Sequence, residues 1–497
     1  MGFSDIGSFG SEIETPNLDA LADAGLRYTD FYNAGRCWPT RTCLMTGYYE
    51  RVVRKRMGAF KADLPFMPHQ LKQAGYRSYH SGKFHIVGAD DPMKAGFDRS
   101  YFIKTLDVGF YSPTTLLLDG KSIPTPDPES GYHVTDAVGD RAIEFLQEHE
   151  SKHKESPFFL YLAHFAPHWP LHAHQKDIDK YRGRYDLGWD QLRENRLRRL
   201  KELKLFDMAS SPIDADKETV PSWNLKGQDL LDTFGNGEVG PATGWDRLNK
   251  EQQTFQSEKM AIHAAMIDHM DRSIGLVIDQ LKAMGEFENT VICFMSDNGA
   301  SAEMMVSRNT THDQHAKPGT YKSYLSIGPA WATAANTPFR LHKHYTHEGG
   351  IATPLIVHWP EGIHDKGGIR RTPGHVIDLL PTMLDLAGVK PLSELNGKPT
   401  WGIQGKSLVE SFASDKNIER PFLFFEHSGH EALRNDDWKI VHKKGGPWEL
   451  YNIRGDRAEN TNVAKEYPET LQQMIQAFKT FQNKGTRMNQ GLPPENK

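Results

Sequence analysis

Amphipathic helical segments and short apolar runs alternate over most of the chain. The longest predicted helix covers residues 260–284, where apolar side chains recur at steps of three and four residues and Gly285 follows. An apolar run at residues 290–295 comes next, and a second helix over 137–148 precedes another such run at 158–163. Continuous apolar strands that alternate with amphipathic helices are typical of a parallel sheet covered on both faces. The pattern therefore predicts an α/β fold with a large mixed, mainly parallel sheet flanked by helices.

A polar segment from about residue 177 to 256 interrupts this alternation. It is rich in Arg and Lys at first and in Gly and Pro later, and its first half has leucines spaced among Arg and Glu. We interpret the segment as a solvated insertion whose first half is an exposed helix. A substrate-specificity element is the alternative interpretation.

The pattern changes near Ser414, where short strand-like runs replace the helix and strand alternation. These runs lie at residues 422–426, 431–434, 438–442 and 448–451, and a predicted helix over 469–482 follows them. Asn-Asp and Gly-Gly pairs between the runs are typical of tight turns. We therefore expect two domains, residues 1–414 and 415–497, the second a small α+β unit with an antiparallel sheet and one helix.

Composition narrows the class of protein. The chain has 497 residues, with 38% hydrophobic and 25% charged residues and a net charge of -5, which is typical of a soluble globular protein. There is no excess of basic residues that would indicate a general role in nucleic-acid binding. No apolar run approaches the roughly 18 residues of a membrane span. Three cysteines are too few for a disulfide framework.

Polar side chains follow the predicted strands directly. Lys83 and His85 come after a strand at residues 76–80, where open parallel sheets place ligand sites. Asp297 and Asn298 follow the strand at 290–295 and offer two oxygen ligands to a hard cation such as Ca²⁺ or Mg²⁺. We expect these side chains to meet in one pocket at the carboxyl edge of the sheet.

One short stretch resembles a family signature. Cys37, Pro39 and Arg41 form the pattern Cys-x-Pro-x-Arg, which continues to Thr46-Gly47. The stretch resembles the sulfatase signature, in which the cysteine is oxidised after translation to formylglycine. Further motifs recur in the order of that family: Thr-Pro-Asn-Leu-Asp at 15–19, Gly-Lys-Phe-His at 82–85, Ala-Pro-His-Trp-Pro at 166–170, Ser-Asp-Asn-Gly at 296–299, and Lys343 five residues before Glu348-Gly349-Gly350. Thr40 and Phe84 depart from the commonest family pattern, which has Ser and Trp there, but each keeps the character of the side chain.

The resemblance covers essentially the whole chain and implies a fold and a set of roles. It implies an alkaline-phosphatase-like large domain and a metal, Ca²⁺ or alternatively Mg²⁺, bound by Asp297, Asn298 and the modified Cys37. Hydrated formylglycine would attack sulfur, and a formylglycine-generating enzyme would be needed during maturation. The resemblance also implies that Arg41 braces the formylglycine and that Lys83, Lys343 and His168 bind the sulfate. His168 would in addition protonate the leaving group, and His85 would act as the base when sulfate is released.

The resemblance also implies residues that this chain does not contain. In the family a first strand ends in Asp-Asp-x-Gly, its two carboxylates bind the metal, and Met1-Gly2 would fill the last two positions. We therefore expect a strand, two metal ligands and an export signal upstream of Met1. Under that expectation the full-length protein is periplasmic or secreted, with a cytoplasmic location as the alternative.

The predicted function is hydrolysis of a sulfate ester, either an aryl sulfate or a sulfated carbohydrate, to an alcohol and inorganic sulfate. A phosphonate monoester or phosphodiester hydrolase of the same superfamily is one alternative, since it can use the same formylglycine and metal. An inactive protein that binds sulfated glycans is another, favoured only if the upstream acid pair is truly absent.

Overall fold

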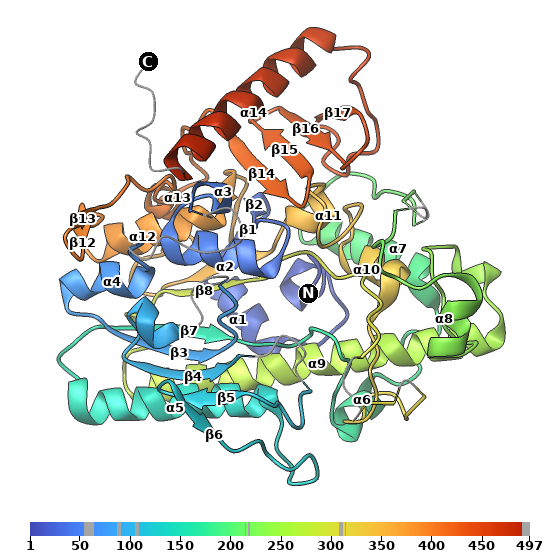
Figure 1. Cartoon of the computed structure of the whole chain (residues 1–497), viewed down its shortest axis with the longest axis horizontal. Coiled ribbons are helices and arrows are strands. Elements are labelled where there is room, and N and C mark those ends of the chain that lie inside the picture. The colour runs from blue at the N-terminus through green and yellow to red at the C-terminus, as the bar shows by residue number, and fades with distance from the viewer. Residues whose placement is uncertain are drawn as a thin grey trace.

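The computed structural model describes residues 1–53, 64–86, 91–104, 109–213, 215–216, 219–307, 312–313 and 315–489 (Figure 1). One sheet has five strands in the order β6-β5-β4-β3-β7. Its strands are β3 (Arg77–Gly82), β4 (Arg99–Ile103), β5 (Leu116–Leu118), β6 (Lys121–Ile123) and β7 (Phe158–Ala163). Strand β3 is parallel to its neighbours β4 and β7, while β4, β5 and β6 form an antiparallel meander.

A second sheet has four strands in the order β10-β1-β9-β8. Its strands are β1 (Leu26–Tyr28), β8 (Ile292–Met295), β9 (Leu355–His358) and β10 (Gly368–Arg370). Strand β9 is antiparallel to both β1 and β8, and β1 is parallel to β10. Two-stranded pairs are formed by β2 (Phe31–Tyr32) with β11 (Gly374–His375) and by β12 (Glu394–Leu395) with β13 (Lys398–Pro399). The mixed α/β class is thus confirmed, and the strands are divided between two sheets where one was expected.

A cavity separates the two sheets. Strands β7 and β8 are the outer strands of their respective sheets, and both line this cavity of about 670 Å³. Apolar side chains from helices on either side, among them Ile274, Val277 and Leu386, also line it. The side chains of β7 and β8 are only half-buried for this reason, although their sequences are as apolar as those of central strands.

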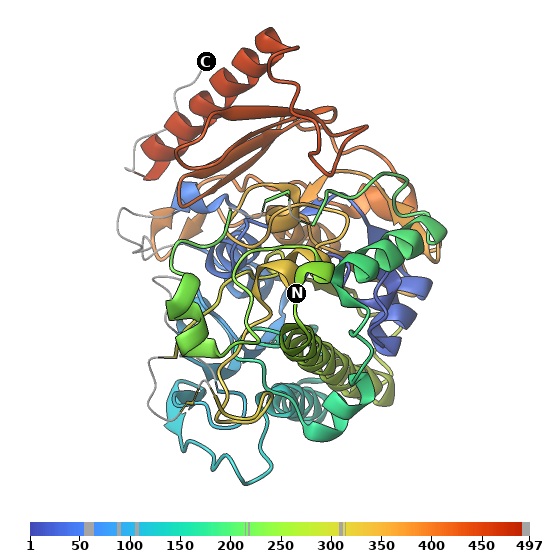
Figure 2. The same ribbon diagram turned by 90° about the vertical axis from the view of Figure 1, so that its right-hand side faces the viewer.

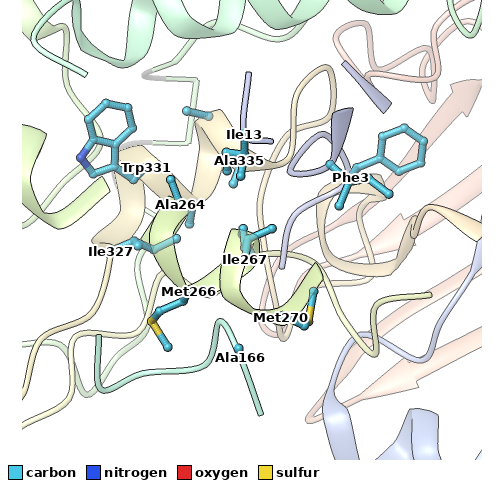
Figure 3. Close-up of a cluster of buried hydrophobic side chains, with 14 of the residues drawn as sticks. Phe3, Ile13, Ala166, Ala264, Met266, Ile267, Met270, Ile327, Trp331 and Ala335 are labelled. Carbon is cyan, nitrogen blue, oxygen red and sulfur yellow. The ribbon is translucent and has the colours of Figure 1, made fainter. Parts of the chain in front are cut away.

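The long helices α5 (Val134–His153) and α9 (Lys250–Ala283) pack side by side along the five-stranded sheet (Figure 1). Helix α9 begins ten residues before the predicted start, because Asn249 caps it by accepting the backbone N–H of Gln252 at 2.9 Å. Its first turns are polar and have no apolar periodicity that would mark them in the sequence. In its middle, Ala264 and Ile267 lie near Ala335 in the buried cluster that also contains Phe3 (Figure 3).

The remaining helices of the larger part are shorter. They are η1 (Gly7–Phe9), α1 (Pro16–Ala24), α2 (Cys37–Thr46), α3 (Glu50–Val53), α4 (Met67–Leu71), η2 (Lys72–Ala74), η3 (Pro92–Ala95), α6 (Gln175–Tyr181), α7 (Gly188–Glu202), α8 (Gly227–Phe234), η4 (Trp245–Arg247), α10 (Gly328–Ala335), α11 (Glu348–Ile351), η5 (Val376–Asp378), α12 (Leu379–Leu386) and α13 (Val409–Ala413). No helix in the described part of the chain is both long and apolar enough to cross a membrane.

The helix predicted in the first half of the polar segment is present, but only one side of it is exposed. This helix is α7, and its Arg196 side chain is 1% exposed and forms ion pairs with Asp5 at 2.8 Å and Glu12 at 2.9 Å. Trp189 of the same helix is fully buried. The charge of Arg196 suggested solvent, yet this side chain is buried against acidic residues near the N-terminus, which compensate its charge.

The C-terminal part contains a separate antiparallel sheet with one helix, which lies above the rest of the molecule in Figure 2. Its strands follow chain order: β14 (Leu423–His427), β15 (His430–Arg434), β16 (Trp438–His442) and β17 (Trp448–Asn452). Helix α14 (Pro468–Asn489) packs on this sheet, where the ring of Phe478 stacks on Phe424 at 4.7 Å. Residues 490–497 lie outside the described residues, and the domain division near residue 414 stays a prediction.

Buried ion pairs join the C-terminal sheet to the larger part. Glu348 is fully buried and accepts hydrogen bonds from Lys439 at 2.8 Å, Arg457 at 2.9 Å and Tyr32 at 2.9 Å. Burial by itself raises the pKa of Glu348, but Lys439 and Arg457 outweigh it and lower that pKa to about 2. The carboxylate is therefore ionised in the folded protein and holds three partners from different segments.

We expect Glu348→Gln to lower the free energy of unfolding by about 3 kcal/mol, because it removes one carboxylate from a buried network in which, among the described residues, Lys439 keeps only Glu459 and Arg457 keeps only Asp30 as ion-pair partners. In the wild type, this carboxylate's contribution is fully present above its unfolded pKa and is lost as pH falls through that value toward 2. Denaturant unfolding of both proteins between pH 7 and about pH 3 measures the difference. Equal stability of the two proteins at pH 7 would contradict the assignment.

Candidate active site

The first residue of helix α2 is Cys37, which is 4% exposed. Its Sγ lies 3.2 Å from Nδ1 of His85, which follows strand β3. The partial positive charge of a helix N-terminus favours negative charge on a group placed there. The helix ends at Thr46, and Gly47 follows with a φ of +69°, which lets its N–H bond to the carbonyl of Cys43 at 2.9 Å.

Arg41 lies one helical turn after Cys37 and joins three elements. Its Nε and Nη2 both donate to Oδ2 of Asp297, at 2.9 and 2.7 Å, just beyond strand β8. Its Nη1 donates to the carbonyl of Lys83 at 2.6 Å and to the Tyr161 hydroxyl of β7 at 3.0 Å. Burial opposes its charge, but Tyr161 and Asp297 outweigh that effect and raise the pKa of Arg41 above its usual range.

Two basic side chains follow strand β3. Lys83 is 5% exposed, and burial lowers its pKa, as do Arg41 and Lys343, while Cys37 and Asp297 partly offset them. Burial, with the nearby charges of Lys83 and Arg41, lowers the pKa of His85 to about 2. The His85 imidazole is therefore neutral at pH 7 and is available to accept a proton.

The loop after β7 contains His168, whose Nδ1 lies 2.7 Å from the carbonyl oxygen of Trp169. A carbonyl only accepts, so Nδ1 carries the proton and the lone pair of the neutral ring lies on Nε2. Burial, followed by the charges of Lys83 and Lys343, lowers the pKa of His168 well below its usual range. This histidine is therefore neutral while the pocket holds no anion.

Glu303 positions several of these groups and was not identified from the sequence. Its Oε2 accepts a hydrogen bond from Lys343 and another from Trp169 Nε1 at 3.3 Å, and its Oε1 lies 3.0 Å from Nε2 of His344. Lys343 and His344 outweigh the effect of burial and hold the pKa of Glu303 below its usual range. Glu303 lies in an irregular loop, where no hydrophobic periodicity marks a residue as buried. Its pairing with Lys343 could therefore be identified only from the folded structure.

The structure brings the predicted site residues together at one end of the cavity between the sheets. The residues from the sequence prediction that line the cavity are Arg41, Lys83, His168, Asp297, Asn298 and Lys343. Cys37 and His85 contact each other, and Cys37 lies one helical turn before Arg41 in α2. Cations cluster at this end, and burial in a low-dielectric wall strengthens their field. The arrangement suits an anionic ligand.

Asp297 and Asn298 offer oxygen atoms of the kind that Ca²⁺ prefers, and a hydrated formylglycine at residue 37 would add another. Asp297 keeps its charge because Arg41 and Lys83 outweigh burial and hold its pKa below the usual range. The same carboxylate is bound twice by Arg41, and Asn298 donates its side-chain N–H to the Gly299 carbonyl at 2.9 Å. One shared carboxylate supplies too little negative charge for a divalent cation that takes about six to eight oxygens. These residues offer the type of ligand atom that calcium prefers, but they are too few to form a calcium site by themselves. The metal assignment therefore stays a proposal.

Comparisons with known proteins agree over nearly the full length. The sulfatase family model matches residues 1–389, and a model described as N-sulphoglucosamine sulphohydrolase, C-terminal, matches residues 339–484. An uncharacterized sulfatase of Schizosaccharomyces pombe is 31% identical over 97% of this chain and 91% of its own length. An arylsulfatase of Klebsiella aerogenes is 29% identical over 82% of this chain and 89% of its own length.

The fold also resembles a crystal structure of Ps i-CgsB in complex with k-i-k-neocarrahexaose. That structure superimposes with a TM-score of 0.67 and 24% identity, over 100% of this chain and 93% of the other. The sulfatase family model covers more than three quarters of the chain, and the Schizosaccharomyces pombe relative and Ps i-CgsB each match nearly all of it. The chain therefore belongs to the sulfatase family and is a sulfuric ester hydrolase.

Proposed function

We propose that the protein hydrolyses sulfate esters of carbohydrates through residue 37, after oxidation of Cys37 to formylglycine by a formylglycine-generating enzyme. The observation that supports this proposal is the position of Cys37, held against neutral His85 at 3.2 Å and one turn from the Arg41–Asp297 pair. Formylglycine supplies a hydrated aldehyde, one hydroxyl of which can displace the alcohol from sulfur while the other allows sulfate to leave.

The side chains around residue 37 have complementary roles in this proposal. Lys83 and Lys343 bind the sulfate oxygens and stabilise the charge that develops on them. His85 is neutral and accepts the proton when sulfate is released. Arg41 fixes the first turn of α2 against the strand ends, because it bonds to Asp297, Tyr161 and the Lys83 carbonyl at once.

His168 is the candidate general acid for the leaving alcohol. Burial, together with the two lysine charges, lowers the pKa of His168 and keeps its ring neutral, and its Nε2 lone pair is free of the backbone bond made by Nδ1. A bound sulfate would offset those lysine charges and so raise the pKa of His168, which would favour a proton on Nε2 when substrate is present. This coupling would favour proton donation in the occupied site.

Carbohydrate sulfates are the proposed substrate class because Ps i-CgsB, which shares the fold, was crystallised with k-i-k-neocarrahexaose. Aryl sulfates are the second class, suggested by the name of the Klebsiella aerogenes relative. The test is to measure sulfate release from a sulfated hexosamine and a nitrophenyl sulfate, beside product release from a nitrophenyl phosphonate and a nitrophenyl phosphodiester.

We expect kcat/KM for the sulfate esters to exceed that for the phosphorus esters by at least roughly tenfold, a difference of about 1.4 kcal/mol in transition-state binding. Faster turnover of the phosphonate or phosphodiester would favour the related phosphorus ester hydrolase. Tight binding of a sulfated glycan without turnover, in protein whose residue 37 is formylglycine, would instead favour a glycan-binding protein.

A further inference from the structure

A second group of polar side chains lies outside the site described above. His133 caps the N-terminus of α5, Asp136 lies in the first turn of the same helix, His174 precedes α6, and His269 projects from α9. One potential ligand atom from each of the four lies within 4.8 Å of the others. Three histidines and a carboxylate from three separate helices thus converge on one point.

The contacts within this group centre on the carboxylate. Oδ1 of Asp136 lies 2.5 Å from Nε2 of His269, and Oδ2 lies 3.7 Å from Nε2 of His174. The imidazole ring of His133 lies 4.9 Å from that of His174 and 4.8 Å from that of His269, centre to centre. Ligands around a tetrahedral zinc at about 2.0 to 2.1 Å are separated by roughly 3.4 Å. Reaching that geometry would lengthen the contact between Asp136 and His269 by roughly 1 Å and slightly shorten the one between Asp136 and His174.

Two buried ring nitrogens of the group have no hydrogen-bond partner among the described residues. They are Nε2 of His133 and Nδ1 of His269. His133 is 2% exposed and His269 is 5% exposed. Leaving a buried donor or acceptor unpaired is costly, and such groups in folded proteins call for a missing partner. A bound ion at Nε2 of His133 would supply one.

His133 needs a change of tautomer to bind an ion through Nε2. In the ion-free protein its Nδ1 accepts the backbone N–H of Thr135 at 3.2 Å, so its proton lies on Nε2. Ion binding would move that proton to Nδ1 and break this long cap bond. His269 needs the same change, because its Nε2 donates to Asp136 in the ion-free protein and would have to pass that proton to Nδ1. Asp136 and His174 complete the ligand set.

The donor set and the access route indicate which ion fits. Imidazoles with one carboxylate suit Zn²⁺ and neighbouring transition metals, whereas Ca²⁺ and Mg²⁺ prefer oxygen ligands alone. The Asp136 side chain is 46% exposed and that of His174 is 28% exposed, so an ion can enter from solvent. The other two ligands are buried and would close the inner side.

We propose that His133, Asp136, His174 and His269 form a binding site for a divalent transition metal, with Zn²⁺ as the best-fitting ion. The ion would tie the N-terminal ends of α5 and α6 to the middle of α9. His174 lies six residues after His168 in the chain, so the ion would also anchor the segment between β7 and α6. Its role is structural and does not depend on the chemistry proposed at Cys37.

The test uses the full chain, treated with a chelator and then titrated with Zn²⁺ by calorimetry and with Co²⁺ by visible absorption. We expect one high-affinity Zn²⁺ per chain, a tetrahedral Co²⁺ spectrum, and a Zn²⁺-dependent rise of several degrees in Tm. The double variant His174→Ala/His269→Ala should lose all three. His174→Gln alone, at a half-exposed position, should weaken Zn²⁺ binding at least tenfold.

The matched control is His364→Ala, which removes an exposed histidine far in sequence from the group and should bind Zn²⁺ like the wild type. Circular dichroism of the metal-free variants shows whether each is folded, and the half-exposed His174→Gln change keeps the test valid if the double variant is not. Absence of Zn²⁺ binding by the wild type, or equal binding by folded His174→Gln, would overturn the proposal.

Discussion

Replacement of Cys37 with alanine is expected to abolish sulfate ester turnover, by roughly three orders of magnitude or more, and to leave the protein folded. Alanine cannot be oxidised to formylglycine, so the nucleophile is lost. The change removes one sulfur atom at the start of α2, and the ring of His85 keeps its place after β3. Steady-state kinetics with nitrophenyl sulfate and thermal unfolding measure the two effects.

Cys43 offers the matched control because it lies in the same helix and is 1% exposed. Its burial in an apolar cluster raises the pKa of the thiol, so it stays protonated and inert. Cys43→Ala should therefore lower the free energy of unfolding by on the order of 1 kcal/mol, through lost packing, and should leave the activity almost unchanged. Equal loss of activity in both variants would mean that the nucleophile has been assigned to the wrong cysteine.

Mass spectrometry of the tryptic peptide that contains Cys37 gives an independent measurement. Protein produced together with a formylglycine-generating enzyme should contain the aldehyde or its hydrate at residue 37, and the specific activity should follow the modified fraction. Fully active protein in which this peptide carries only unmodified cysteine would rule out the proposed chemistry.

The second large effect is expected from an engineered extension before Met1, a strand of about six apolar residues ending in Asp-Asp. Met1 lines the cavity between β7 and β8, and its carbonyl accepts a hydrogen bond from Ser296 at 3.0 Å, one residue before Asp297. We propose that the extension fills the cavity and pairs with both outer strands. Each large apolar side chain buried contributes about 1.5 to 3 kcal/mol, so the free energy of unfolding should rise by several kcal/mol.

The two added carboxylates should also give this chain a calcium affinity that Asp297 alone cannot provide. They would bring the site to net negative charge and supply part of the missing oxygen set. Calcium titration by calorimetry measures this effect separately from thermal unfolding.

The control is the same extension ending in Asn-Asn, which keeps the strand and removes the charge. It should match the Asp-Asp form in calcium-free Tm and fall well below it in calcium affinity. Identical Tm, calcium affinity and arylsulfatase activity in the extended and unextended chains would show that the added segment takes no part in the site.

Local pattern was enough to predict many elements and the motifs of the site. The apolar run at 158–163 is strand β7 at the predicted residues, and the four C-terminal strands appear within a residue or two of prediction. In such segments the apolar period and the turn residues act over a few positions, so they can be identified without the rest of the chain. Spacing within motifs likewise identified Cys37 and Arg41 as site residues and placed Asp297 just after a strand, whereas the helix that contains Cys37 and Arg41 was not predicted.

Only the tertiary structure decided the features that depend on contacts between distant segments. The division into two sheets follows from which strands meet, and the burial of Arg196 follows from acids 184 and more residues away in the chain. Glu303 acquired its place beside Lys343, and three histidines met Asp136, because helices and loops far apart in sequence were packed together. By itself the sequence determined local elements and the identity of the reactive groups, since both depend on neighbouring residues. Partners, charge balance and burial depend on the folded arrangement, and no local period encodes them.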